Sequence, residues 1–274
     1  MAAVVNLYNY FYNLADPRVK NWFMMENPFP TLGIIGVYLL LVLQILPNFM
    51  KNRKPFELTK IIRLYNIFQV VACIGIMYSI LTSGWIQGEY NIGCSPIDYS
   101  NKPNPVKLLG AFYWLYLLKG VELIETIFFA LRKKNNQITG LHIYHHGSTF
   151  FLAWIGCKFI GGGMASIPPF VNSFIHVLMY TYYYLSSLGP EWQKKLQPWK
   201  PRLTMLQMIQ FTLLIIHSLT ALQTDCKVPK QFLLIYIPNV VVIFKMFYDF
   251  YTTSYTPSKK QQINGLHSKV KKHT

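Results

Sequence analysis

Charged residues are scarce in this chain, and acidic residues are the scarcest of them. Charged side chains make up 13% of the 274 residues, with 10 aspartates and glutamates against 26 lysines and arginines. Soluble domains carry about 25% charged residues, so the composition excludes an ordinary soluble enzyme. The hydrophobic share is 52% and the mean hydropathy is +0.25, which indicates an all-α, multi-pass membrane protein with one domain over residues 1–274.

The sequence also has no N-glycosylation acceptor and no basic segment ahead of an apolar N-terminal core. The second absence predicts that no signal peptide is cleaved. What the chain has instead is a series of apolar stretches, each near the ~20 residues that a bilayer core requires. They are residues 31–49, 65–85, 109–131, 141–157, 166–187, 204–223 and 232–252, followed by a basic tail, 253–274. The sequence therefore predicts seven transmembrane helices.

Basic residues concentrate on one side of the predicted spans. The loops after the first, third and fifth spans, together with the tail, hold most of the 26 lysines and arginines. By the positive-inside rule this side is cytosolic, which places the N-terminus in the lumen and the C-terminus in the cytosol. In the tail, Lys271 and Lys272 resemble a dilysine signal for retrieval to the endoplasmic reticulum. An ordinary basic tail that meets anionic lipid is the alternative.

Cysteine is rare, and the 4 cysteines divide by location. Cys73 and Cys157 lie within or at the edge of spans, whereas Cys94 and Cys226 lie in two different luminal loops. Because the lumen is oxidising, the sequence predicts a disulfide between Cys94 and Cys226, with two free loop thiols as the alternative.

Most of the 7 histidines lie in predicted spans, and three of them form the motif His142-x-x-His145-His146. On a helix this spacing, with Thr149 at i+7, predicts that the side chains share one face. Imidazoles in an apolar membrane segment are costly to bury without partners, so they indicate a functional site. Structural histidines that are hydrogen-bonded within a helix bundle are the alternative.

Neighbouring spans carry polar residues that suit these histidines. In the third span, Lys119 and Glu122 can form an ion pair, which is either structural or functional. Glu122 or Glu125 can also accept a ring N–H and so hold a histidine in one tautomer. Further polar candidates in the third, fifth, sixth and seventh spans are Thr126, Asn172, His176, Tyr180, Tyr183, Gln207, Gln210, His217, Lys245, Tyr248 and Asp249.

Two kinds of chemistry suit a cluster of imidazoles. The first is metal chemistry. Membrane di-iron oxygenases carry a similar histidine motif, but they need several such motifs. A single zinc site or a metal-dependent lipid oxidase stays as an alternative. The second chemistry is acyl transfer, in which an imidazole attacks a thioester and a second imidazole or a tyrosine supplies a proton or an oxyanion donor. Basic cytosolic loops suit the phosphates of coenzyme A. Neither Cys73 nor Cys157 lies in a polar motif, so histidine would replace the cysteine of soluble condensing enzymes.

Four polar motifs follow one another through the third to sixth spans. They are Lys119-x-x-Glu122-x-x-Glu125-Thr126, His142-x-x-His145-His146, Asn172-x-x-x-His176-x-x-Met179-Tyr180-x-Tyr182-Tyr183 and Thr204-x-x-Gln207-x-x-Gln210-Phe211. In this combination and order they resemble the ELO family of very long chain fatty acid elongases, the 3-oxoacyl-CoA synthases of the endoplasmic reticulum. The resemblance covers essentially the whole chain. Glu125 stands where the family usually has aspartate, and the carboxylate is kept.

The resemblance implies a fold of seven transmembrane helices, six of them forming an inverted barrel around a closed acyl tunnel. It implies that a long-chain acyl-CoA condenses with malonyl-CoA, without a cofactor, to give a 3-oxoacyl-CoA two carbons longer, carbon dioxide and coenzyme A. The expected partners are both substrates, the lipid bilayer, and the separate reductases and dehydratase of the elongation cycle. A homodimer stays open, and no nucleic acid is expected. A multi-pass transporter or receptor with intramembrane histidines is the alternative from another class.

These considerations assign roles to the candidate residues. We expect His145 to accept the acyl group, His176 to orient the thioester or stabilise the enolate, and His142 and His146 to hold the geometry. Residues expected to support them are Lys119, Glu122, Glu125, Thr126, Asn172, Tyr180, Gln207 and Gln210. Residues expected to bind substrate are His217, Tyr183, Lys245 and Tyr248. No metal ligand is expected.

Overall fold

The computed structural model describes residues 10, 13–223 and 225–256, and within these residues it contains helices and no strand. A long helical segment overlaps each stretch for which the sequence predicts a span, although the helix over the sixth stretch ends at Thr220, before the predicted end at residue 223. The segments are α2 with the π-helical turn η2 and α3 (Phe29–Leu40, Leu41–Ile45 and Leu46–Met50), α4 with η3 (Thr59–Ile80 and Leu81–Trp85), α5 with α6 (Pro103–Glu122 and Ile124–Leu131), α7 (Gly140–Phe159), α8 (Ile167–Ser186), α10 (Trp199–Thr220) and α11 (Leu233–Tyr255). A short helix, α9 (Pro190–Leu196), joins α8 to α10.

The hydropathy of these helices agrees with a membrane protein. Four segments of the described chain are long and apolar enough to cross a membrane by themselves. They are Phe29–Met50, Thr59–Trp85, Trp199–Thr220 and Lys230–Tyr255. The chain is therefore an all-α membrane protein, and the helices α5 to α8 carry the polar motifs that lower their own hydropathy.

Several helices begin earlier than the apolar stretches predict, because their first turns are made of polar residues beyond the apolar run. α4 begins at Thr59 rather than at residue 65, and α10 begins at Trp199 rather than at residue 204. α5 begins at Pro103, where proline is favoured because its missing N–H would lack an intrahelical partner anyway. These first turns contain polar residues such as Lys60 and Lys200, which a hydropathy pattern does not detect.

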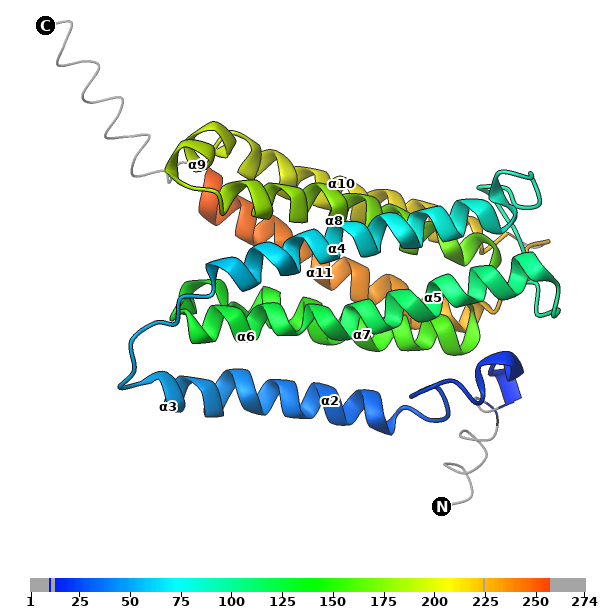
Figure 1. Ribbon diagram of the computed structural model, residues 1–274. Helices are drawn as coiled ribbons and strands as arrows, with labels where there is room; N and C mark the ends of the chain where they lie inside the picture. Colours follow the sequence, from blue (N-terminus) through cyan, green and yellow to red (C-terminus); the bar gives the residue numbers. More distant parts are fainter. Residues whose placement is uncertain (1–9, 11–12, 224, 257–274) are drawn as a thin grey trace, which may run out of the picture.

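Helices that are distant in the sequence pack against one another. Contacts join α4 to α5 and α8, α8 to α10, α10 to α11, α11 to α7, and α7 to α5. Figure 1 shows these helices in one bundle, with α2 and α3 along its edge, where they contact α7 and α6 respectively. The largest buried apolar cluster includes Tyr38, Ile76, Phe112 and Trp154, so it connects α2 to α4, α5 and α7.

A disulfide ties two loops together at one end of the bundle. Cys94, in the segment after α4, is bonded to Cys226, in the segment after α10, with their Cα atoms 5.6 Å apart. Beside it Gly163 has a φ of 51°, and a Cβ there would lie 2.4 Å from the carbonyl oxygens of Ser95 and Pro96. Only glycine fits this close approach, so the loop after α4 is held against the segment before α8 as well.

The basic tail is described as far as Thr256. The predicted start of the tail at residue 253 falls within α11, which continues to Tyr255. Lys271 and Lys272, the predicted retrieval signal, lie outside the described residues.

Candidate active site

The three histidines of α7 point in two directions. Thr139 begins the helix by accepting a hydrogen bond from the backbone N–H of His142 at 3.2 Å. His142 and His146 lie one turn apart, with ring centres 4.2 Å from each other. His145 instead lines an internal cavity, and its ring lies 6.1 Å from that of Phe247 on α11. The spacing predicts that the three side chains share one face of the helix. In the structure His145 and His146 point in different directions, because successive residues of an α-helix are about 100° apart.

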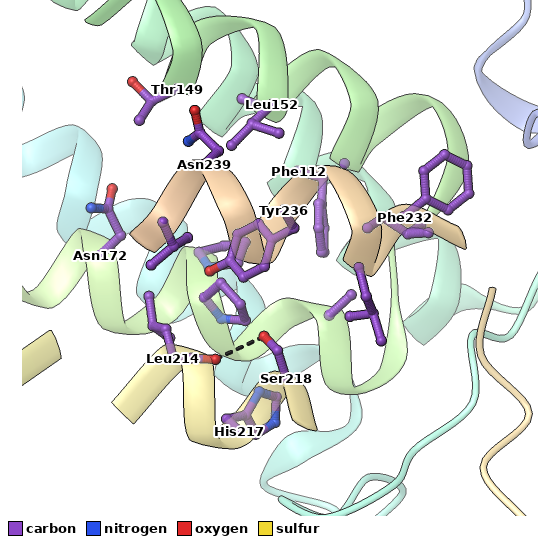
Figure 2. Close-up of a pocket in the computed structure, with 18 of the residues that line it drawn as sticks. Phe112, Thr149, Leu152, Asn172, Leu214, His217, Ser218, Phe232, Tyr236 and Asn239 are labelled. Carbon is purple, nitrogen blue, oxygen red and sulfur yellow. Dashed lines mark hydrogen bonds between the residues drawn. The ribbon is translucent and has the colours of Figure 1, made fainter. Parts of the chain in front are cut away.

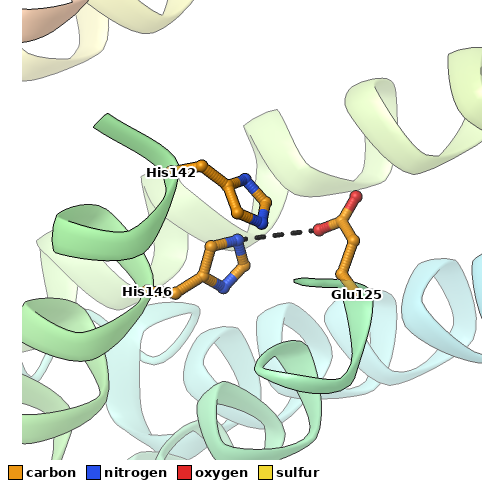
Figure 3. A group of neighbouring side chains, drawn as sticks. All are labelled: Glu125, His142 and His146. Atoms are coloured by element: carbon orange, nitrogen blue, oxygen red, sulfur yellow. Dashed lines mark ion pairs between the residues drawn. The ribbon is translucent and has the colours of Figure 1, made fainter. Parts of the chain in front are cut away.

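His142 and His146 face a polar cluster on α6. Nε2 of His142 lies 2.9 Å from Oγ1 of Thr126, whose hydroxyl lies 2.9 Å from that of Tyr38. Nε2 of His146 lies 3.6 Å from Oε2 of Glu125, and Figure 3 shows both imidazoles turned toward this carboxylate. These two imidazoles are therefore oriented by side chains of the third predicted span.

Glu122 is the centre of a second buried cluster. The helix breaks at Leu123, so Glu122 ends α5 while Glu125 belongs to α6. Nζ of Lys119 donates hydrogen bonds to both oxygens of Glu122 at 2.9 Å. Nδ1 of His176, from α8, lies 3.2 Å from Oε1 of the same carboxylate, in a contact that is off the hydrogen-bond direction. Since Glu122 is 0% exposed, the ammonium of Lys119 compensates its buried charge.

A largely apolar cavity of about 200 Å³ begins at His145. Its α7 wall extends to Ile160, which corresponds to about 22 Å of helix rise. At the His145 end the cavity is lined by Lys119, Asn172 and Gln210, from three other helices. Figure 2 shows the remaining wall. Its apolar residues include Phe112, Leu152, Leu214, Phe232, Leu233 and Ile243.

The polar residues at the far end of the cavity are mostly bonded to backbone. Oγ of Ser218 donates a hydrogen bond to the carbonyl oxygen of Leu214 at 2.7 Å (Figure 2). Nε2 of His217 lies 3.1 Å from the carbonyl oxygen of Ile92. The structure thus places His217 on the cavity wall, as a residue that also holds the loop after α4.

The other residues predicted to bind substrate lie away from the cavity. The side chain of Lys245 is 70% exposed, Tyr248 is 52% exposed and Tyr183 is 38% exposed. None of these described side chains lines the cavity. Gln207, predicted to support the site, donates a hydrogen bond to the sulfur of Met179 at 3.6 Å and is likewise not on the wall. Helical spacing alone did not distinguish the inner side of α10 and α11 from the outer side.

Two polar residues of α11 line the cavity without having been predicted. They are Tyr236 and Asn239, and Oδ1 of Asn239 accepts a hydrogen bond from Tyr144 of α7 at 2.9 Å. An asparagine in an apolar membrane helix is itself a sign of a polar contact, so the sequence did contain a signal for Asn239. No such signal exists for Tyr236, because one tyrosine does not stand out in a chain rich in aromatic residues.

The cluster of Glu125, His142 and His146 has the composition of a metal site. One ligand atom from each residue lies within 4.8 Å of the others, and two imidazoles with a carboxylate suit zinc or non-haem iron. The hydrogen bond with Thr126 already occupies Nε2 of His142. The arrangement therefore serves equally as a hydrogen-bonded support for α7.

Comparison with known proteins identifies relatives over nearly the full chain. The model of the GNS1/SUR4 family, ELO, matches residues 23–263. Very long chain fatty acid elongase 4 of Mus musculus is 41% identical over 273 residues, covering 96% of this chain and 85% of the mouse protein. Very long chain fatty acid elongase 4 of Homo sapiens is 41% identical over 271 residues, covering 96% and 84%. Very long chain fatty acid elongase 7 of Rattus norvegicus is 38% identical over 258 residues, covering 93% and 91%.

Proposed function

The chain belongs to the GNS1/SUR4 (ELO) family, and we propose that it is an enzyme of fatty acid elongation that condenses a long-chain acyl-CoA with malonyl-CoA. The products are a 3-oxoacyl-CoA two carbons longer, carbon dioxide and coenzyme A. Support comes from relatives that are named as very long chain fatty acid elongases and from the geometry of the site. The observation that carries the proposal is His145 at the polar end of a long apolar cavity.

In the first half-reaction, the fatty chain lies in the apolar cavity with its thioester at His145. The imidazole nitrogen bonds to the acyl carbon, the carbon–sulfur bond breaks, and the ring N–H proton goes to the leaving thiolate of coenzyme A. His142 and His146 orient α7, through Thr126 and Glu125, so that His145 stays on the cavity side. No thiol is needed, and the buried Cys73 and Cys157 have no part in this step.

In the second half-reaction, malonyl-CoA loses its carboxylate as carbon dioxide and becomes an enolate. The enolate carbon bonds to the acyl carbon, and the bond to His145 breaks. His176, whose Nδ1 lies 3.2 Å from Oε1 of Glu122, stabilises the enolate oxygen. The amides of Asn172 and Gln210 line the cavity at this end and supply further donors to developing charge.

The fold of this enzyme would be an inverted barrel of six helices around the acyl tunnel, with the segment Phe29–Met50 outside. The cyclic order of contacts through α4, α8, α10, α11, α7 and α5 supports this arrangement. We place the protein in the endoplasmic reticulum membrane, with a luminal N-terminus, a cytosolic C-terminus and Lys271 and Lys272 as the retrieval signal. Basic cytosolic loops would bind the phosphates of both CoA substrates, and the reductases and dehydratase of the cycle would take the product.

Intact mass spectrometry of the purified protein with acyl-CoA alone tests this proposal. We expect the parent to gain one acyl group and to release one equivalent of coenzyme A before any malonyl-CoA is added. His145→Ala should form no adduct, whereas His176→Ala should form the adduct but release it slowly when malonyl-CoA is supplied. An adduct on His145→Ala, or none on the parent, would show that the nucleophile is assigned wrongly.

A further inference from the structure

Buried polar atoms without a hydrogen-bond partner concentrate between α4 and α8. Within the described residues, eleven buried side-chain nitrogen and oxygen atoms have no such partner, and eight of them belong to these two helices. The eight atoms are Oη of Tyr65, Nδ2 of Asn66, Nε2 and Oε1 of Gln69, Oγ of Ser173, Nδ1 of His176, Oη of Tyr180 and Oγ of Ser186. Each unpaired buried polar group is unfavourable, so a concentration along one interface requires a physical reason.

These atoms form a row along the interface. Asn66 and Gln69 lie at i and i+3 on one face of α4, and His176 and Tyr180 lie at i and i+4 on one face of α8. The rings of Tyr65 and Tyr180 meet across the interface at 5.9 Å. The two helices pack against each other and run side by side in Figure 1, and the contact between Tyr65 and Tyr180 brings their polar residues together.

The row extends from the end of the bundle to the buried site. At its outer end the guanidinium of Arg63 donates a hydrogen bond to the carbonyl oxygen of Ser187 at 2.6 Å. From Arg63 to Gln69 the helix rises about 9 Å, and Gln69 is 0% exposed. At its inner end the row reaches His176, which lies 3.2 Å from Glu122. Buried polar side chains therefore lie at intervals between the predicted cytosolic side and the cluster beside the cavity.

The condensation proposed above requires one proton from solvent in each turnover. The first half-reaction is balanced, because the N–H proton of His145 leaves with coenzyme A. In the second, the electron pair of the broken C–N bond returns to the imidazole of His145, and the malonyl carboxylate has left as carbon dioxide. The imidazole must then gain a proton from water, at the polar end of a pocket whose wall is mostly apolar.

We propose that the row between α4 and α8 holds water molecules and delivers this proton from the cytosolic side to the His176–Glu122 pair and on to His145. The inference rests on the proposed function. Water occupies polar spaces in which it finds several partners, and polar groups inside a membrane protein face wet cavities. Tyr65, Gln69 and Tyr180 are thus positioning residues, which act on the reaction through water.

The test separates the two half-reactions in Gln69→Leu and Tyr65→Phe. Release of coenzyme A from acyl-CoA alone reports the first half-reaction, and product formation after addition of malonyl-CoA to the acylated protein reports the second. We expect Gln69→Leu to keep the parental first half-reaction and to slow the second by about 100-fold, the lower end of what general acid–base catalysis contributes. Tyr65→Phe, which removes one hydroxyl, should slow the second by about tenfold. In both variants the solvent deuterium isotope effect should increase only in the second half-reaction.

Gln44→Leu is the matched control, because it makes the same substitution at an exposed position of η2; it should leave both half-reactions at parental rates. If Gln69→Leu fails to give a monodisperse protein, Tyr65→Phe decides the question. Parental rates and isotope effects in the second half-reaction of both variants would overturn the proton route. Equal slowing of both half-reactions would also overturn it, because it would mean a structural role. Failure of the parent to release coenzyme A would instead refute the proposed function.

Discussion

Two lysine–carboxylate pairs, each within a single helix, have opposite surroundings. Lys119 and Glu122 on α5 are 2.9 Å apart, with side chains 5% and 1% exposed. Lys245 and Asp249 on α11 are 2.6 Å apart, with side chains 70% and 57% exposed. The exposed pair is shorter but contributes less to stability, because water and salt screen it. In the buried pair, a charge that loses its partner stays uncompensated. Burial, and not distance, decides what each pair does for the protein.

The largest effect should come from breaking the buried pair from one side. Glu122→Leu leaves the ammonium of Lys119 buried without its carboxylate and removes the partner of His176. We expect the free energy of unfolding to fall by about 3–5 kcal/mol, measured by denaturant unfolding of the detergent-solubilised protein. A loss below 1 kcal/mol would mean that water or another group reaches Lys119, and the contrast between the two pairs would disappear.

Removing both members of the buried pair separates its structural role from its functional one. The double variant Lys119→Met, Glu122→Leu leaves no uncompensated charge, so most of the lost stability should return. Its elongation rate should stay about 100-fold below the parent, because an oriented imidazole typically loses that much when its partner is removed. Elongation assayed at matched folded fraction checks this. Recovery of the rate together with the stability would make the pair purely structural.

The contrast between the two pairs also shows what the sequence could predict. The pair of Lys119 and Glu122 was expected from its spacing, and it is present. The four helical segments that are long and apolar enough to cross a membrane were also predictable, because apolar runs of bilayer length are a direct consequence of the membrane. What could not be predicted is which side of α11 faces inward, since its apolar residues surround the helix. As a result the sequence does not distinguish the exposed Lys245 from Tyr236, which lines the cavity.

The histidine motif had the same limit. Its spacing identified a functional helix, but only the packing of α7 against α6 and α11 separates His142 and His146 from His145. The polar residues of α4, such as Gln69, could not be assigned a role from the sequence for a related reason. One glutamine in an apolar stretch has little meaning by itself, and its significance depends on the atoms that α8 places opposite.

A smaller effect is expected at the supported imidazoles. His142→Ala removes the contact with Thr126 but keeps His145 on the cavity wall, so we expect elongation to fall by about tenfold. Chelation distinguishes this role from metal binding by Glu125, His142 and His146. If a metal is essential, a chelator should abolish the parental activity and zinc or ferrous iron should restore it. We expect the chelated parent to keep its rate, and the His142→Ala acyl adduct to form more slowly but to full yield.

The smallest effect should come from the exposed pair. Asp249→Asn removes the ion pair of α11 but leaves both groups in contact with solvent, so the free energy of unfolding should change by less than about 1 kcal/mol. Because the pair is screened, that small difference should shrink further when the salt concentration is raised from 0.1 to 1 M, which shortens the Debye length from about 10 Å to 3 Å. Denaturant unfolding of both proteins at the two salt concentrations measures this. A loss of stability comparable to that of Glu122→Leu, or one that salt does not reduce, would contradict this prediction. It would mean that a partner or lipid head groups cover Lys245 and Asp249, so that this pair is not exposed in the membrane-embedded protein.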